Sequence, residues 1–124
     1  MKTITSPDAP AAIGPYSQAK VHGNLIFTSG QIPLDPASGN VVEGGIGEQT
    51  LQTIKNLGAV LKEGGAGFES VIKTTCFLSD MADFAPFNEV YEQFFVNKPA
   101  RSCVAVKALP KGVLVEIEAI AVVE

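Results

Sequence analysis

The segment 113–123, Val-Leu-Val-Glu-Ile-Glu-Ala-Ile-Ala-Val-Val, constrains the fold of this chain more than any other. Its β-branched residues predict a strand, whose side chains alternate between two faces. One face is wholly apolar and consists of Val113, Val115, Ile117, Ala119, Ala121 and Val123. The other face sets two carboxylates among apolar neighbours: Leu114, Glu116, Glu118, Ile120 and Val122. A sheet with two apolar faces needs two covers, and we expect helices on one face and another subunit on the other.

A second strand is predicted at 101–108, just before this segment. The intervening Leu-Pro-Lys-Gly has the proline and glycine of a turn, so we expect a hairpin. The favourable register would place four polar side chains on one face: Arg101, Cys103, Glu116 and Glu118. On a solvated face, the same arrangement would be a cross-strand salt bridge contributing roughly 0 to 1 kcal/mol. The residues alone leave both interpretations open.

The rest of the chain predicts four further strands and two helices. Residues 2–5 suit a short edge strand, and 16–21 and 25–32 suit a hairpin around Gly23-Asn24. The first helix is expected at 47–63, and its apolar stripe is Leu51, Ile54, Leu57, Gly58 and Leu61. The next strand, 70–78, would place on one face Ile72, Thr74, Cys76 and Leu78.

A second helix follows, with Asp83 as its expected N-cap. Its aromatic stripe is expected to lie in the core and consists of Phe84, Phe87, Tyr91, Phe94 and Phe95. The order of elements favours an α+β fold, in which one sheet carries two helices on one face.

Composition and charge exclude several classes of protein. The length of 124 residues suits a single domain. A net charge of −4 argues against sequence-independent nucleic-acid binding, which needs a surface of Lys and Arg. Two cysteines are too few for a disulfide scaffold. No signal peptide or transmembrane run is evident, so we expect a cytoplasmic protein without membrane contact.

Three motifs, in order along the chain, resemble those of the RidA family (YjgF/YER057c/UK114), the reactive-intermediate imine deaminases. They are Ile13-Gly-Pro-Tyr-Ser-Gln-Ala19, Thr28-Ser-Gly-Gln-Ile-Pro33, and Pro99-Ala-Arg-Ser-Cys-Val104 with Val115-Glu-Ile-Glu118. The resemblance covers nearly the whole chain and implies one domain, 1–124. It also implies a chorismate-mutase-like α+β fold with a six-stranded, mostly antiparallel sheet. The molecule would be a homotrimer with the open sheet faces inward and the ligand clefts between subunits.

The family's activity would be hydrolysis of reactive 2-imino or 2-enamino acids, such as 2-aminoacrylate and 2-iminobutanoate, to 2-oxo acids and ammonia. By resemblance, Arg101 holds the substrate carboxylate, which suits the planar fork of a guanidinium. Glu116 orients water and handles protons. The remaining substrate-binding positions implied by the family are Tyr16, Ser29, Gly30, Asn88 and Cys103. The resemblance requires no metal or organic cofactor, and the implied partners are small carboxylic acids and other copies of the chain.

Several points stay open at this level. Arg101 could instead form a structural ion pair, and Glu118 competes with Glu116 by position. Gly30 could mark the close approach of a ligand or a bulge. Cys103 has no evident base, since His22, the only histidine, lies beside a predicted turn. Lys98 stands where family members often have Phe, which affects the rim of the cleft.

A second functional class is a trimer that binds small carboxylates as a regulator without turnover. Such a protein needs Arg101 but not Glu116. Endoribonuclease and holdase activities, also attributed to the family, are disfavoured by the acidic charge and the lack of a basic surface.

Overall fold

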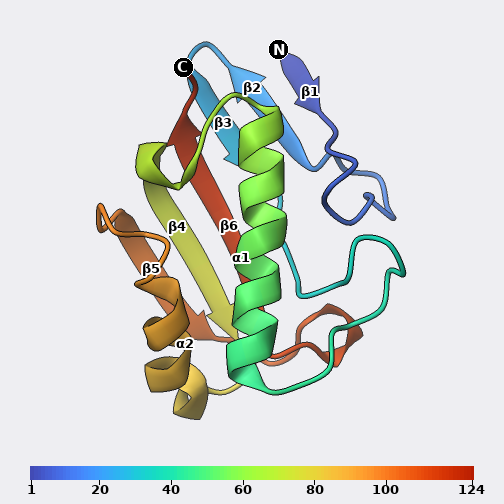
Figure 1. Cartoon of the computed structure of the whole chain (residues 1–124), viewed down its shortest axis with the longest axis vertical. Helices are drawn as coiled ribbons and strands as arrows, with labels where there is room; N and C mark the ends of the chain where they lie inside the picture. The colour runs from blue at the N-terminus through green and yellow to red at the C-terminus, as the bar shows by residue number, and fades with distance from the viewer.

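The computed structural model describes residues 1–124 as one six-stranded sheet with two helices on one face (Figure 1). The helices are α1 (Ile46–Glu63) and α2 (Phe84–Tyr91). The strands are β1 (Lys2–Ile4), β2 (Ala19–His22), β3 (Leu25–Thr28), β4 (Val71–Leu78), β5 (Ala100–Ala105) and β6 (Val115–Val122). Their order across the sheet is β1-β2-β3-β6-β4-β5, and only β4 and β5 run parallel. The expected α+β architecture is therefore confirmed.

The N-terminal hairpin forms where it was predicted, although its strands are shorter. Strands β2 and β3 pair antiparallel, with His22 opposite Leu25 on either side of the two-residue turn. Gly23 has φ of +60°, a conformation that glycine adopts without steric cost and that tight hairpin turns require.

The predicted hairpin between the last two strands is wrong. Strand β6 lies between β3 and β4 and is antiparallel to both, whereas β5 pairs parallel with β4 at the edge of the sheet. A strand, a helix and a second strand commonly form a parallel crossover, and β4–α2–β5 follows that rule. Residues 106–114 then carry the chain past the end of β4, where the Val106 amide donates to the Leu78 carbonyl.

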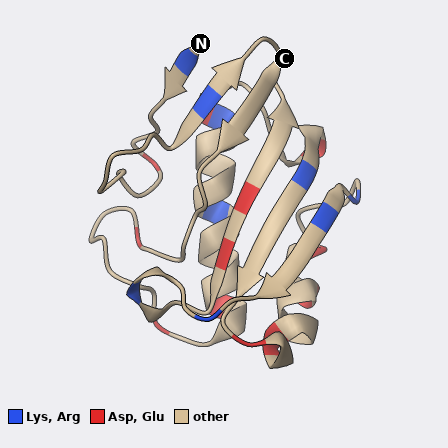
Figure 2. Cartoon of the chain, turned by 180° about the vertical axis from the view of Figure 1, so that it is seen from behind, with Lys and Arg blue, Asp and Glu red and all other residues tan.

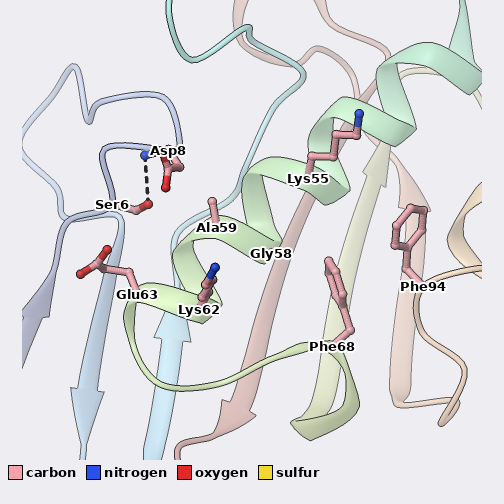
Figure 3. A pocket seen from close by; sticks show the side chains of 9 residues that line it. All are labelled: Ser6, Asp8, Lys55, Gly58, Ala59, Lys62, Glu63, Phe68 and Phe94. Carbon is pink, nitrogen blue, oxygen red and sulfur yellow. Dashed lines mark hydrogen bonds between the residues drawn. The ribbon is translucent and has the colours of Figure 1, made fainter.

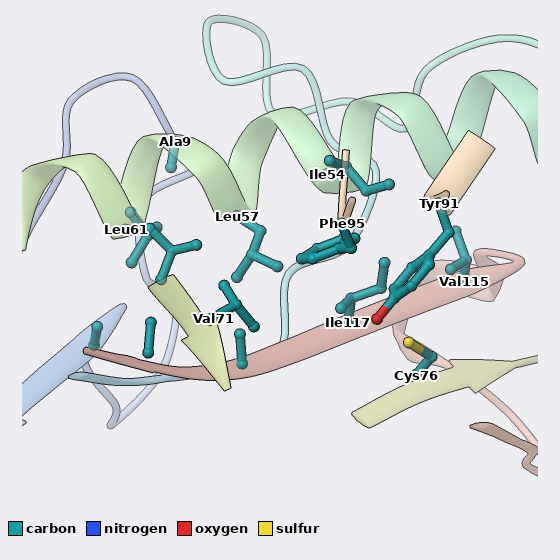
Figure 4. Close-up of a cluster of buried hydrophobic side chains, with 14 of the residues drawn as sticks. Ala9, Ile54, Leu57, Leu61, Val71, Cys76, Tyr91, Phe95, Val115 and Ile117 are labelled. Atoms are coloured by element: carbon teal, nitrogen blue, oxygen red, sulfur yellow. The ribbon is translucent and has the colours of Figure 1, made fainter. Parts of the chain in front are cut away.

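The core lies between the sheet and the two helices (Figure 4). Helix α1 buries Ile54, Leu57, Val60 and Leu61 against the apolar face of β6. The prediction for Leu51 is wrong: it lies on the side of α1 away from the sheet, and Thr50, Thr53 and Asn56 are buried instead. The Asn56 amide is satisfied because it donates to the carbonyls of Ile32 and Leu34.

A β-bulge changes which residues of β4 are buried. The register of β4 against β6 shifts between Val71 and Lys73. Because the bulge adds one residue on the β4 side, Val71 is buried and Ile72 is exposed, contrary to the predicted face. After the bulge the alternation is as predicted, with Thr74, Cys76 and Leu78 buried.

The aromatic stripe of the second helix belongs to the core, as expected. Phe87, Tyr91 and Phe95 are all buried. The expected cap is displaced by three residues, because the Asp80 carboxylate accepts from the Ala82 amide at 2.8 Å, whereas Asp83 makes no side-chain cap. Asp80 thus begins the short 3-10 turn that leads into α2.

No helix covers the other face of the sheet, here called the bare face (Figure 2). By register it carries Phe27, Phe77, Ser102, Val104, Glu116, Glu118 and Ile120. Two of its large apolar side chains are well exposed, Phe27 by 42% and Val104 by 48%. Both termini lie at one end of the sheet (Figure 1). Neither helix has the length and apolar character needed to cross a membrane.

Candidate functional site

The predicted site residues separate into two groups on opposite faces of the sheet. In the sheet register Arg101 lies beside Thr74, whose side chain is buried under the helices. Glu116 pairs with Phe77, on the bare face. The expectation that Arg101 and Cys103 share a face with Glu116 and Glu118 is therefore wrong. The reason is the insertion of β4 between β5 and β6, which also rules out the cross-strand salt bridge.

The first group surrounds a cavity of about 410 Å³ beside the bare face. Four predicted residues line it, namely Tyr16, Ser29, Gly30 and Glu116. Burial raises the pKa of the Glu116 carboxyl, and the neighbouring Glu118 charge raises it further. A carboxylate with a raised pKa is a better proton acceptor, so Glu116 is suited to proton transfer.

Gly30 lies against the Glu116 side chain. A Cβ at Gly30 would stand 2.7 Å from Cδ of Glu116, closer than van der Waals contact allows. Strand β3 ends at Thr28, so Gly30 does not interrupt a strand. The space left by the missing side chain is occupied by Glu116 itself. Beside it, the Ser29 hydroxyl donates to the Ser17 carbonyl at 2.6 Å and keeps its lone pairs for another donor.

Gly30→Ala is expected to displace the Glu116 carboxylate while leaving the fold intact, because the colliding atoms belong to the flexible end of a side chain. Any reaction that uses Glu116 should slow by about 10²-fold, the cost of a misplacement of about 1 Å. Gly47→Ala is the matched control, since a Cβ there meets nothing within 4 Å. Equal rates for the two variants would show that the position of Glu116 is unimportant.

The second group surrounds Arg101 at the edge strand β5. One guanidinium nitrogen, Nη1, donates to Oδ1 of Asn88 at 2.8 Å. The guanidinium carbon lies 4.8 Å from the centroid of the Tyr91 ring, within cation–π distance. Beside it is a small cavity of about 260 Å³, which is also lined by Lys98. Lys98 has φ of +53° and lines this cavity together with Arg101.

Cys103 lies on the same face as Arg101, opposite Cys76 in the β4–β5 register. Burial raises the pKa of the Cys103 thiol, and the Arg101 charge only partly opposes this effect. Little thiolate exists at neutral pH when the pKa is raised, so the thiol is poorly suited to nucleophilic attack. His22 lies at the hairpin turn of β2 and β3, as expected.

Residues 6–123 match the sequence profile of the family described as Endoribonuclease L-PSP, also known as YjgF/RidA. The chain belongs to the RidA family. It is 52% identical to a mouse 2-iminobutanoate/2-iminopropanoate deaminase, over 98% of this chain and 90% of that protein. It is 54% identical to a protein of Lactococcus lactis named as a candidate regulator, AldR, over 100% of this chain and 99% of that protein.

A solved structure agrees with this assignment of the fold. E. coli TdcF with bound serine has a TM-score of 0.95 to this chain and 44% sequence identity, and the match covers 100% of both chains. The names of these relatives thus include a deaminase and a regulator, the two functional classes that the sequence leaves open.

The largest hollow of this RidA-family chain, about 530 Å³, lies elsewhere (Figure 3). It runs over the outer face of α1, between Ser6 and Asp8 on one side and Phe68 and Phe94 on the other. None of the predicted site residues lines it. Size alone therefore does not identify the functional site.

Sequence reasoning missed four residues that line the Glu116 cavity, and two of them are Ile13 and Lys111. Ile13 is 74% exposed and belongs to the first family motif. Lys111 has φ of +57° in the turn Pro110–Gly112, where the sequence signal was the flanking proline and glycine. Both residues come from loops whose positions the sequence pattern does not specify.

Proposed function

We propose that this RidA-family chain hydrolyses small 2-imino acids, and their 2-enamino tautomers, to 2-oxo acids and ammonia. The observation that carries the proposal is the Glu116 carboxylate, which lines a cavity and has a raised pKa. The mouse relative named 2-iminobutanoate/2-iminopropanoate deaminase and the serine-bound TdcF structure support a small amino-acid-derived ligand.

The site needs two chains, because Arg101 and Glu116 lie on opposite faces of one sheet. A substrate with only a few heavy atoms cannot contact both in a single chain. The exposed apolar side chains of the bare face favour burial against other copies. A cyclic homotrimer, the assembly implied by the family resemblance, would bring Glu116 of one subunit to Arg101 of the next across each head-to-tail contact.

In this cleft Arg101 holds the substrate carboxylate through two parallel N–H donors. Water adds to C2 of the imine, giving a proton to Glu116, while the imine nitrogen takes up a proton. Glu116 then gives its proton to the amino nitrogen of the carbinolamine and takes up the hydroxyl proton, the C–N bond breaks as the carbonyl forms, and ammonia leaves with the 2-oxo acid as the other product. Glu116 moves the protons, and the Ser29 hydroxyl and the Gly30 amide are available to orient the water or the carboxylate.

The second candidate is a trimeric protein that binds small carboxylates as a regulator without turnover. The L. lactis relative named as a candidate regulator favours it. Both candidates use Arg101, but only the deaminase needs an ionisable group at position 116. Turnover therefore separates the two classes, whereas binding does not.

The deciding measurement is ammonia release from a freshly generated 2-imino acid, with and without protein, together with the molar mass by light scattering. We expect protein-dependent ammonia release by a trimer. Binding of a 2-oxo acid without any acceleration of ammonia release would instead assign the regulatory function. A monomer at micromolar concentration would contradict the intersubunit site.

A further inference from the structure

We infer that Tyr91, held in place by Thr74, positions the Arg101 guanidinium for carboxylate binding. The inference rests on the proposed function and adds two positioning residues to it. Three aromatic rings lie near the guanidinium carbon, and Tyr91 is the closest at 4.8 Å, compared with 5.5 Å for Phe84 and 5.9 Å for Phe87. Tyr91 therefore provides the surface against which Arg101 lies.

Tyr91 is itself fixed at both ends. Its hydroxyl is 2.7 Å from Oγ1 of Thr74, in a buried hydrogen bond. Its ring stacks on Phe95, with the centroids 4.3 Å apart and the planes tilted by 24°. Figure 4 shows the hydroxyl of Tyr91 pointing toward the sheet, among the buried side chains. Because its hydroxyl and one face of its ring are restrained, Tyr91 keeps its position when the Arg101 side chain moves.

Thr74 links this restraint to Arg101 through the sheet. Thr74 on β4 is the register partner of Arg101 on β5, so the two backbones are held side by side. The contacts thus form a closed loop, from Arg101 to the Tyr91 ring, from its hydroxyl to Thr74, and back to Arg101 through the paired strands. Strand pairing and this hydrogen bond restrain the ring relative to the backbone at Arg101, and the bond to Asn88 restrains the guanidinium.

This arrangement leaves the guanidinium free on the side that a ligand needs. An arginine has five N–H donors, and within the chain Arg101 uses its Nη1 for Asn88. The Tyr91 ring contacts the guanidinium without using an N–H donor, because a cation–π contact involves the ring face. Enough donors remain for a bidentate bond to a carboxylate, and their direction is fixed before the ligand arrives.

The test compares Tyr91→Leu with Tyr91→Phe by calorimetric titration with 2-oxobutanoate and by imine turnover. Loss of the ring should raise Kd and KM by about 2–30-fold, the range of a cation–π contact, with kcat within about threefold of wild type. Tyr91→Phe keeps the ring but loses the hydrogen bond to Thr74, so it should recover only part of the affinity. Phe68→Leu is the control for aromatic packing, since Phe68 contacts Phe94 and Phe95 but not Arg101.

Two results would overturn the inference. The first is that Tyr91→Leu raises Kd by the same factor in an Arg101→Lys background as in the wild-type protein. That background has no guanidinium for Tyr91 to position, so Tyr91 would then act in some other way. The second is an equal rise for Phe68→Leu, which would indicate a general packing effect. Failure of the proposed function looks different: wild-type protein would bind 2-oxobutanoate without releasing ammonia, while Tyr91→Leu would still weaken that binding.

Discussion

Glu116→Gln is expected to slow imine hydrolysis by about 10²–10⁴-fold, the usual contribution of a general acid–base group. Glutamine keeps the shape of the side chain against Gly30 but cannot accept a proton. Affinity for a 2-oxo acid should change much less, because Arg101 still holds the carboxylate. Ammonia release gives the rate, and calorimetric titration gives the affinity. Equal losses in both would assign Glu116 a role in binding, and an unchanged rate would move proton transfer to Glu118 or to solvent.

The free energy of unfolding of Glu116→Gln, measured as a function of pH, tests whether this variant is folded as the wild type is. The pKa of Glu116 is higher in the folded chain than its ordinary value. As pH rises above about 4, the unfolded chain loses this proton first, so ionisation of Glu116 lowers the free energy of unfolding. Glu116→Gln should therefore be at least as stable as wild type at pH 7, with the difference vanishing below about pH 4. A marked loss of stability at pH 7 would invalidate the kinetic comparison.

Arg101→Lys is expected to reduce kcat/KM by about 10–100-fold, because it keeps the charge but loses hydrogen bonds to a charged partner. The stronger test mixes Arg101→Lys and Glu116→Gln chains by co-expression. If each site takes Arg101 from one subunit and Glu116 from the next, every mixed trimer contains one intact site. Random mixing of equal amounts then restores about a quarter of wild-type activity.

No recovery in verified mixed trimers would show that both groups act within one chain or at different sites. The control is the Arg101→Lys variant co-expressed as two chains that carry the same two tags. Its activity must stay at the level of the unmixed variant.

Much of the fold follows from local pattern. The alternation along 113–123 predicted both faces of β6, and the periodicity of 47–63 predicted α1 to within one residue. The errors arise where packing or pairing decides the outcome. The Val71–Lys73 bulge adds a residue that reverses the alternation. The burial of Thr50 and Thr53 in place of Leu51 depends on where the sheet lies under the helix.

The candidate site shows the same division. The family motifs identified Arg101 and Glu116 as site residues. The residue pattern of each strand, however, does not specify which other strand pairs with it. A tight turn between 101–108 and 113–123 suggested direct pairing, while the helix before Arg101 favoured the parallel crossover to β4. That choice of neighbour places Arg101 and Glu116 on opposite faces. The second subunit that we propose at the site is therefore inferred from topology, which residue patterns alone did not provide.

The position of the two termini at one end of the sheet has a practical consequence for protein engineering. Strand β6 runs from Glu116 toward the C-terminus, and Glu124 lies eight positions beyond Glu116, a span of about 26 Å in an extended strand. The N-terminal strand β1 begins at that same far end (Figure 1). Affinity tags of two kinds, or a fluorescent donor and acceptor, can therefore be fused to either end at a distance from Glu116. Tandem purification on two such tags would isolate mixed trimers of known composition.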